Sequence, residues 1–591
     1  MKQFFRALLL GCLAVLTAIA VHAEAPSFQV VYPPNNHTTK SDRIFFIGTA
    51  PAAGVVTVNS NTIRRSRAGH FAPSFPLQVG DNLFSIRYQD QERKIKVSRV
   101  ANQPTLPSGL GFAANSLQPA LDIARPSGEP ICFSAVAAPN ATVSVKLANQ
   151  NIPLTAQPPS AQLPASNAIL TGQNQPINPS NISNYQGCNT ISATDRDLNL
   201  GKPEFQLALN GQTTTQVGGG QITILSPIQF QVATVTAPAG VARTGPSTDY
   251  SRLTPLPQGT RSVITGREGD WLRLGYGGWI DRKETQILPS GTVPPRAIIR
   301  SVGYRQQPQH LEMVFPLTTP VPVTVQPNGR SLVLTLHNTT AQTDVIRLDD
   351  NPLISRLDWQ QVAPDRVQYT FNFKKDQHWG YQLRYEGSSL VMALRRPPVL
   401  AKKSRQPLTG IKVLIDPGHG GKESGAPGPN GYLEKDVNLI VSRLVRDELR
   451  QQGATVVMTR EDDRDLSLPA RMAAIERESP TLALSIHYNS LPDNGDLEKT
   501  KGVGTFWYHP SAHSLAIFMQ NYIVKQMNRP SYGVFWNNLA LTRPTAAPSV
   551  LLELGFMTNP EEFEWVTNPQ QQRRLAQTIA QGVREWLQSV Q

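Results

Sequence analysis

The sequence predicts a multi-domain protein in which several N-terminal all-β modules precede a C-terminal α/β domain with a helix-covered sheet. The chain has 591 residues, which is more than a single hydrophobic core can serve. Most of the first 400 residues are short alternating apolar and polar runs followed by Pro, Gly or Asn, a pattern typical of small β-modules. From residue 410, apolar strands alternate with segments of helical periodicity, which indicates a sheet covered by helices.

Residues 1–23 have the pattern of a secretory signal. A basic start precedes an apolar run over 7–21, and small residues at 21–23 form a cleavage site. Lipidation at Cys12 is an alternative, but the apolar run continues past this cysteine. No later stretch has the length and apolarity of a membrane span. We therefore expect an exported protein in a periplasm, with an extracellular cell wall as the alternative.

Two β-modules are expected before residue 234. Residues 26–100 resemble bacterial immunoglobulin-like modules, and residues 118–230 form a module whose type the sequence does not indicate. The segments that carry the first resemblance are 48–51, 56–59, 69–71 and 80–83. Cys132 and Cys188 remain after the signal, and an even pair in an exported chain is most simply one disulfide, with two buried thiols as the alternative. The polar stretch 156–186 is predicted to be a long irregular loop.

Two further β-modules are expected before a Pro- and Lys-rich linker at 397–409. Residues 234–290 resemble the bacterial SH3-like domain through the segments 241–247, 256–260, 269–272 and 278–280. Trp271 and Trp279 either line a ligand groove there or, as we prefer, fill the core of a small barrel. Residues 296–396 resemble, in their paired alternating strands, the AMIN domain, which localises amidases and envelope transport proteins.

Charge is unevenly distributed along the chain. The net charge of +13 divides into +15 over residues 1–409 and −2 from residue 410 onward. Such a basic N-terminal part suits docking on an anionic polymer, and a solvated surface that keeps the protein soluble is an equal alternative. Nucleic acid is not expected as a partner, because the chain is exported and has no nucleic-acid motif.

The C-terminal domain is predicted at 410–589. Its expected strands are 413–415, 455–458, 482–486, 504–508 and 550–553, and its expected helices are 436–452, 511–527 and 570–588. Ligands of such sheets bind beyond the carboxyl ends of the strands. His419, His487 and Glu553 all lie at or just past predicted strand ends, so we expect them to converge.

Four polar residues of this domain together suggest a catalytic zinc site. His419, Glu434 and His487 offer three ligands, and a catalytic zinc ion keeps its fourth position for water or substrate. Glu553 lies in the apolar run 549–556, where an unpaired carboxylate is costly unless it has a task such as proton transfer. Each residue alone has a structural alternative: a turn histidine, a helix-start acid, a core histidine or a buried ion pair.

The motifs around these residues resemble those of the zinc-dependent N-acetylmuramoyl-L-alanine amidase family. The matching motifs lie at 416–421, 434–438, 459–460, 468–471, 485–489 and 553–556, within residues 411–588. The resemblance implies that His419, Glu434 and His487 bind one zinc ion and that Glu553 is the catalytic carboxylate. The implied reaction hydrolyses the amide between N-acetylmuramic acid and L-alanine, which releases stem peptides from glycan strands during wall remodelling or cell separation.

Three further expectations concern the surroundings of this site. Asp416 either orients His419 or caps the turn, and Asn489 and Asn559 are candidates to contact substrate or to orient the ligands. Some relatives carry an inhibitory helix after the second histidine motif. Here residues 491–502 are polar and too short for a stable helix with loops, so we expect regulation through the β-modules.

The expected partners are peptidoglycan and, through the N-terminal modules, envelope or cell-division regulators. Two other functions remain open on the sequence alone. One is a zinc hydrolase that cleaves within the stem peptide, whose products would keep alanine on muramic acid. The other is a wall-binding scaffold with a degenerate catalytic domain, which the intact set of four site residues disfavours.

Overall fold

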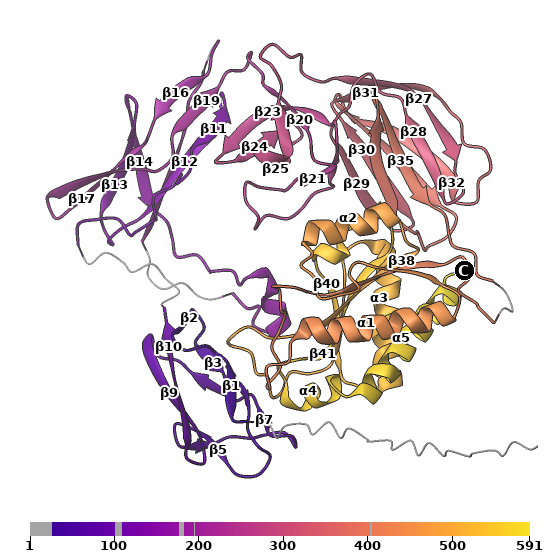
Figure 1. The fold of residues 1–591 in the computed structure, drawn as a ribbon. Coiled ribbons are helices and arrows are strands. Elements are labelled where there is room, and N and C mark those ends of the chain that lie inside the picture. Colours follow the sequence, from indigo (N-terminus) through magenta and orange to yellow (C-terminus); the bar gives the residue numbers. More distant parts are fainter. Residues whose placement is uncertain (1–26, 101–108, 177–182, 194, 402–404) are drawn as a thin grey trace, which may run out of the picture.

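The computed structural model describes residues 27–100, 109–176, 183–193, 195–401 and 405–591. The predicted signal at 1–23 lies outside the described residues, as do residues 402–404 of the predicted linker. Figure 1 shows β-rich parts, in indigo to salmon, arranged around an α/β part in orange and yellow. Within the described ranges, no helix is both long and apolar enough to cross a membrane.

The first β-rich part, residues 27–100, is built around a small apolar core. Phe46, Phe71 and Ile86 are fully buried in this core. Its strands form the sheets β1-β4-β7 and β2-β10-β9-β5-β6 and the pair β3-β8. The bounds are β1 (Gln29–Tyr32), β2 (His37–Thr39), β3 (Arg43–Phe45), β4 (Ile47–Thr49), β5 (Val56–Val58), β6 (Asn61–Thr62), β7 (His70–Phe71), β8 (Ser74–Pro76), β9 (Gly80–Tyr88) and β10 (Gln91–Arg99).

The second β-rich part contains a disulfide. Cys132 and Cys188 are directly opposite each other on paired strands and are joined by it. These strands belong to the six-stranded sheet β12-β15-β14-β13-β17-β18. The loop between β14 and β15 is long, as the sequence predicts, and its described residues include a short 3-10 helix, η1. The bounds are β12 (Pro130–Val136), β13 (Thr142–Leu147), β14 (Gln150–Ala156), η1 (Ser166–Thr171), β15 (Asn184–Thr190), β17 (Glu204–Leu209) and β18 (Gln212–Val217).

The second β-rich part, within residues 118–230, and the third, within residues 234–290, share one eight-stranded sheet. Strand β11 pairs with β19 on one side and with β23 on the other, so hydrogen bonds cross the predicted module boundary. Trp279 is 7% exposed, with Arg125 and Arg273 over its ring, whereas Trp271 is partly exposed. The bounds are β11 (Ile123–Pro126), β16 (Leu198–Gly201), β19 (Ile222–Leu225), β20 (Val232–Val235), β21 (Ala239–Gly240), β22 (Leu256–Pro257), β23 (Arg261–Glu268), β24 (Trp271–Leu274), β25 (Trp279–Asp281), η2 (Arg282–Glu284) and β26 (Thr285–Ile287).

The fourth β-rich part, residues 297–395, has two sheets, β31-β27-β28-β35-β34 and β29-β30-β33-β32. Apolar residues of both sheets, including Phe315, Tyr369 and Phe371, form one buried core. The bounds are β27 (Ala297–Gln306), β28 (His310–Phe315), β29 (Val323–Asn328), β30 (Ser331–His337), β31 (Thr339–Ile346), β32 (Ile354–Ala363), β33 (Arg366–Phe373), β34 (Tyr381–Glu386) and β35 (Ser389–Arg395).

The α/β part is a six-stranded sheet in the order β37-β36-β38-β41-β39-β40. The first four strands of this order are parallel, while β39 is antiparallel to β41 and β40 is parallel to β39. Helices α1, α3 and α5 bury their apolar residues against one face, and α2 and η3 cover the other. The strand bounds are β36 (Lys412–Pro417), β37 (Thr455–Met458), β38 (Leu482–Asn489), β39 (Val503–Trp507), β40 (Ser531–Trp536) and β41 (Ser549–Phe556). The helix bounds are α1 (Glu434–Gln451), α2 (Leu468–Glu478), α3 (Pro510–Met527), η3 (Ala540–Thr542), α4 (Pro560–Val566) and α5 (Pro569–Ser589).

The first β-rich part packs on the loop after β38, residues 490–502, which we call the rim loop. Phe45 and Ile47 form an apolar cluster with Leu491 and Leu497 of this loop. The carboxylate of Asp493 contacts the side chains of Tyr32 and His37. The rim loop forms turns without a helix, as the sequence predicts.

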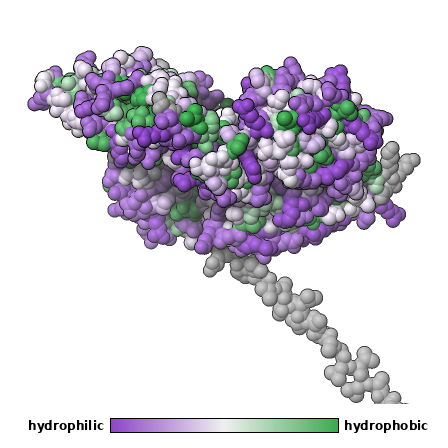
Figure 2. Space-filling model, turned by 90° about the horizontal axis from the view of Figure 1, so that it is seen from above, coloured by the Kyte–Doolittle hydropathy of each residue, from purple (hydrophilic) through white to green (hydrophobic). Residues whose placement is uncertain are grey.

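Hydrophobic residues do not form one continuous band on the face of the molecule that Figure 2 presents. That face is mainly hydrophilic, with small groups of hydrophobic residues over the β-rich parts.

Candidate metal centre

His419, Glu434 and His487 converge at the carboxyl ends of β36 and β38, as the sequence predicts. Each offers one ligand atom, and these atoms all lie within 4.8 Å of one another. His419 Nε2 lies 3.2 Å from Glu434 Oε2, and His487 Nδ1 lies 3.1 Å from Glu434 Oε1. Glu434 is the first residue of α1, so the start of this helix carries the carboxylate between the two imidazoles.

The backbone around His419 is shaped by glycines. His419 itself has a φ of 58°, in the left-handed region that ordinary residues rarely adopt. A Cβ on Gly418 would lie 2.2 Å from the His487 ring. A Cβ on Gly425 would lie 2.4 Å from Glu434 Oε2 and 2.7 Å from His419 Cδ2. Only glycine therefore fits at these two positions with the three side chains in place.

Two buried arginines hold the loop that carries His419. Arg471 donates to the carbonyl oxygens of Pro417 (2.8 Å) and His419 (2.6 Å), and Arg460 donates to those of Pro417 (3.0 Å) and Gly418 (2.8 Å). Both arginines are at most 2% exposed. The sequence motifs pointed to these positions, but not to this role.

Asp416 supports His419 indirectly. Its carboxylate accepts hydrogen bonds from Thr459 (2.5 Å), Ser485 (2.7 Å) and Arg471 (2.8 Å). Among the contacts of the described residues, none joins this carboxylate to the His419 imidazole. The expectation that Asp416 orients this imidazole directly is therefore replaced by a chain of contacts through Arg471.

Glu434 is held by several donors in addition to the imidazoles. Its oxygens accept hydrogen bonds from Asn438 Nδ2 at 3.1 Å and from the backbone nitrogens of Ala426 (2.8 Å) and Tyr488 (3.2 Å). Burial alone would raise the pKa of Glu434, but the contacts with His419 and His487 hold it below its usual range. Glu434 is therefore an ionised carboxylate at neutral pH, which is the form that binds a metal.

Glu553 stands beside His487 on the neighbouring strand β41, where the two residues are direct partners in the parallel register. Its Oε2 is buried and has no hydrogen-bond partner within the described part of the chain. Burial, followed by the charge of Glu434, raises the pKa of Glu553 well above its usual range. The two imidazoles and the carboxylate of Glu434 form a three-ligand cluster that fits a divalent cation, and the buried, donor-free oxygen of Glu553 on the adjacent strand fits a group that accepts a proton from water.

The two asparagines occupy different environments. Asn489 is half-buried at the end of β38, close to His487 in the chain. Asn559 is 1% exposed, and its amide donates to Leu497 O (2.7 Å) and Thr500 O (3.1 Å) of the rim loop while its oxygen caps α4. Asn559 therefore braces the rim loop rather than contacting substrate.

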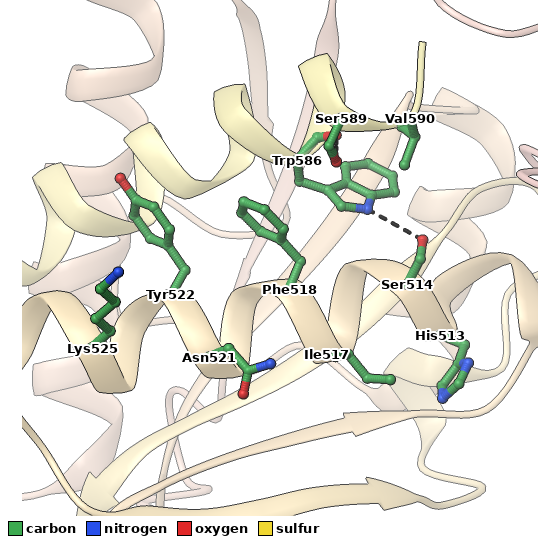
Figure 3. A pocket seen from close by; sticks show the side chains of 10 residues that line it. All are labelled: His513, Ser514, Ile517, Phe518, Asn521, Tyr522, Lys525, Trp586, Ser589 and Val590. Atoms are coloured by element: carbon green, nitrogen blue, oxygen red, sulfur yellow. Dashed lines mark hydrogen bonds between the residues drawn. The ribbon is translucent and has the colours of Figure 1, made fainter.

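A separate groove lies between α3 and α5. Figure 3 shows Phe518 of α3 pointing towards α5 near Trp586, whose Nε1 donates to Ser514 Oγ at 3.2 Å. None of the metal-site residues lines this groove. The groove therefore belongs to the packing of the two helices rather than to the metal centre.

Known proteins resemble the α/β part. Residues 413–585 match the family model described as N-acetylmuramoyl-L-alanine amidase. The uncharacterised protein YqiI of Bacillus subtilis is 34% identical over 185 residues, which is 31% of this chain and 87% of YqiI. The germination-specific N-acetylmuramoyl-L-alanine amidase of the same species is 34% identical over 194 residues, covering 30% of this chain and 80% of that protein.

Among solved structures, the amidase AmiC2 of Nostoc punctiforme is 35% identical and covers 30% of this chain and 97% of its own, with a TM-score of 0.29. The catalytic domain of CwlV from Paenibacillus polymyxa is 33% identical, and the match covers 31% of this chain and 99% of that domain, with a TM-score of 0.29. The family match at residues 413–585 covers the part that holds the His-Glu-His cluster. This chain therefore belongs to the N-acetylmuramoyl-L-alanine amidase family, and it is a peptidoglycan hydrolase.

Proposed function

We propose that His419, Glu434 and His487 bind a single zinc ion and that Glu553 is the catalytic carboxylate of the amidase. The observation that carries this proposal is the convergence of three ligand atoms within 4.8 Å beside the unpartnered Oε2 of Glu553. A bound zinc ion supplies a Lewis acid that polarises the scissile carbonyl and acidifies a water molecule.

The side chains of the chain itself handle the proton and the geometry. Glu434 holds both imidazoles, and Arg471 and Arg460 fix the loop of His419. Glu553 takes a proton from the attacking water and passes it to the amine of L-alanine as the amide bond breaks. The products are a stem peptide with a free N-terminal alanine and a glycan strand with a free lactyl carboxylate. Asn489, half-buried beside His487, is the candidate for a substrate contact.

The β-rich parts are proposed to place the enzyme on the cell wall outside the cytoplasmic membrane, in a periplasm after removal of residues 1–23. Immunoglobulin-like, SH3-like and AMIN-like identities are proposed for residues 26–100, 234–290 and 296–396 from their sequence patterns, and each of these ranges is rich in strands. Residues 24–409, which remain after that removal, carry a net charge of +13, which suits an anionic wall polymer. Envelope or cell-division regulators are the further partners that these parts would recruit.

Digestion of purified peptidoglycan tests the chemistry. The mature, zinc-loaded chain should release stem peptides with N-terminal alanine, identified by mass spectrometry. Glu553→Gln should lower this release by at least about 100-fold, the usual contribution of a general base. Glu461→Gln, at an exposed carboxylate of the same domain, is the control and should keep full activity. Release of peptides lacking alanine, or an active Glu553→Gln variant, would overturn the assignment.

A further inference from the structure

One segment of the second β-rich part reaches the edge of the active site. Residues 157–176, which we call the strap, leave β14 and carry η1 to the α/β part, where Figure 1 shows η1 beside β40. The Tyr532 hydroxyl of β40 donates a hydrogen bond to the carbonyl oxygen of Leu170 in η1. Asn494 of the rim loop donates to Gln173 of the strap. The strap is thus attached at two points near the site.

Tyr532 lies beside the row of register partners that contains the catalytic carboxylate, because Gly533, the next residue, is the partner of Gly504 on β39. His487 is the register partner of Glu553, and Glu553 is the partner of Gly504 on β39. A Cβ on Gly504 would lie 3.1 Å from Tyr532 Cδ1 and 3.7 Å from Glu553 Cβ, so both side chains are on one face of the sheet with only a glycine between them. The charge of Glu553 also contributes, after burial, to a raised pKa of Tyr532.

This row has the dimensions of a peptide-binding site. Two strand spacings of about 4.8 Å separate β41 from β40, so β40 lies roughly 10 Å from the strand of Glu553. An extended peptide covers that distance in about three residues. The Tyr532 ring is held edge-on against Phe556, with centroids 5.1 Å apart, while its hydroxyl reaches the carbonyl oxygen of Leu170 in the strap. A phenolic hydroxyl in this position can donate to a peptide carbonyl.

The strap is bound with little apolar burial. No residue of η1 is buried, and Leu163 and Ile169 are 81% and 53% exposed. Because it buries so little surface, the strap can leave without disrupting a core.

We propose that Tyr532 is a substrate-binding residue that donates a hydrogen bond to a backbone carbonyl of the stem peptide, and that Leu170 of the strap occupies this bond in the resting chain. The proposal rests on the assigned role of Glu553, since it places the stem peptide along the row from Glu553 to Tyr532. The strap then competes with the substrate, and its departure frees the subsite.

Steady-state kinetics on soluble N-acetylmuramoyl-L-alanyl-D-glutamyl peptides test both parts of the proposal. In one variant, residues 163–173 are replaced by Gly and Ser at the same length, with the disulfide cysteines retained. This replacement should lower KM by about 2- to 10-fold, the value of one hydrogen bond, and leave kcat unchanged. Adding Tyr532→Phe in that background should raise KM by a similar factor. In the full chain, Tyr532→Phe removes both the bond to the strap and the bond to substrate, so its effects on KM should largely cancel.

The outcomes separate the alternatives. An unchanged KM after strap replacement would overturn the competition, and an unchanged KM after Tyr532→Phe in the strap-replaced chain would overturn the role in substrate binding. Calorimetry on the same chains carrying Glu553→Gln measures peptide binding without turnover. The strap-replaced chain should bind the peptides more tightly than the full chain, and adding Tyr532→Phe to it should weaken binding again. Failure of the Glu553 assignment would appear separately, as persistent activity of Glu553→Gln. Tyr522→Phe, on α3, is the control for loss of a tyrosine hydroxyl and should leave KM unchanged.

Discussion

Arg471 Nη1 lies 2.8 Å from Asp416 Oδ1 in an ion pair whose side chains are only 2% and 1% exposed. The same guanidinium donates to His419 O at 2.6 Å, so the pair connects helix α2 to the loop of a proposed zinc ligand. Burial would raise the pKa of Asp416, but Arg471, Thr459 and Ser485 hold it below its usual range.

Removing one charge of this pair should destabilise the domain strongly. Asp416→Asn leaves the Arg471 guanidinium buried without its counter-charge, which typically costs about 3–5 kcal/mol. Denaturant unfolding of the zinc-free chain measures this loss. Arg477→Lys, at an exposed arginine of the same helix, should change the free energy of unfolding by less than about 0.5 kcal/mol. Equal effects of the two substitutions would contradict the structural role of the pair.

Two glycines with similar backbone conformation offer a matched test of the metal site. Gly425 (φ +68°) and Gly431 (φ +82°) both have a left-handed backbone, so a change to alanine costs about 1–2 kcal/mol at each. A Cβ on Gly425 meets Glu434 and His419, whereas a Cβ on Gly431 meets open space. Gly425→Ala should therefore weaken zinc binding by at least about tenfold, and Gly431→Ala should not. Competition with a chromophoric chelator measures both affinities, and equal affinities would remove Gly425 from the site.

The positions of His419 and His487 followed from the sequence because parallel strands end at a common edge of the sheet. Glu434, at the predicted helix start, also lies where expected. The support from Arg460 and Arg471 could not be derived in this way, because a buried arginine is recognised only by the carbonyls around it. Strand β40 was not predicted: its sequence 531–536 is a short edge strand after Pro530 and lacks clear alternation. Tyr532 was therefore missed as well.

Contacts between segments that are distant in the sequence could not be predicted either. The sheet shared by β11 and β23 and the contact of the strap with Tyr532 join residues more than 100 positions apart. Local periodicity carries no information about such pairings, because strand alternation specifies which face is buried but not which partner covers it.

The contact of the first β-rich part with the rim loop should stabilise that loop. Phe45 is 3% exposed and packs with Leu491 and Leu497. Phe45→Ala should cost about 3–5 kcal/mol in this cluster and increase amide hydrogen exchange in residues 490–502. Leu83→Ala, at a leucine that is 74% exposed in the same part, is the control. Unchanged exchange in the rim loop after Phe45→Ala would show that the two parts are energetically independent.

Acid should loosen the junction between the fourth β-rich part and the α/β part. Burial lowers the pKa of His509 to about 4, and burial together with His509 lowers the pKa of His378 to about 4. The unfolded chain binds these protons near pH 6.5, so both residues favour the folded state above that pH and lose this contribution as the pH falls toward 4. The loss reaches about 3 kcal/mol per histidine near pH 4, and about 2 kcal/mol of it has occurred by pH 5. The double variant His378→Gln, His509→Gln should therefore show a smaller drop in Tm between pH 7 and pH 5 than the unmodified chain. His513→Gln, at an exposed histidine on α3, should show the same drop as the unmodified chain. A double variant that is equally acid-sensitive would place the titrating groups elsewhere in the fold.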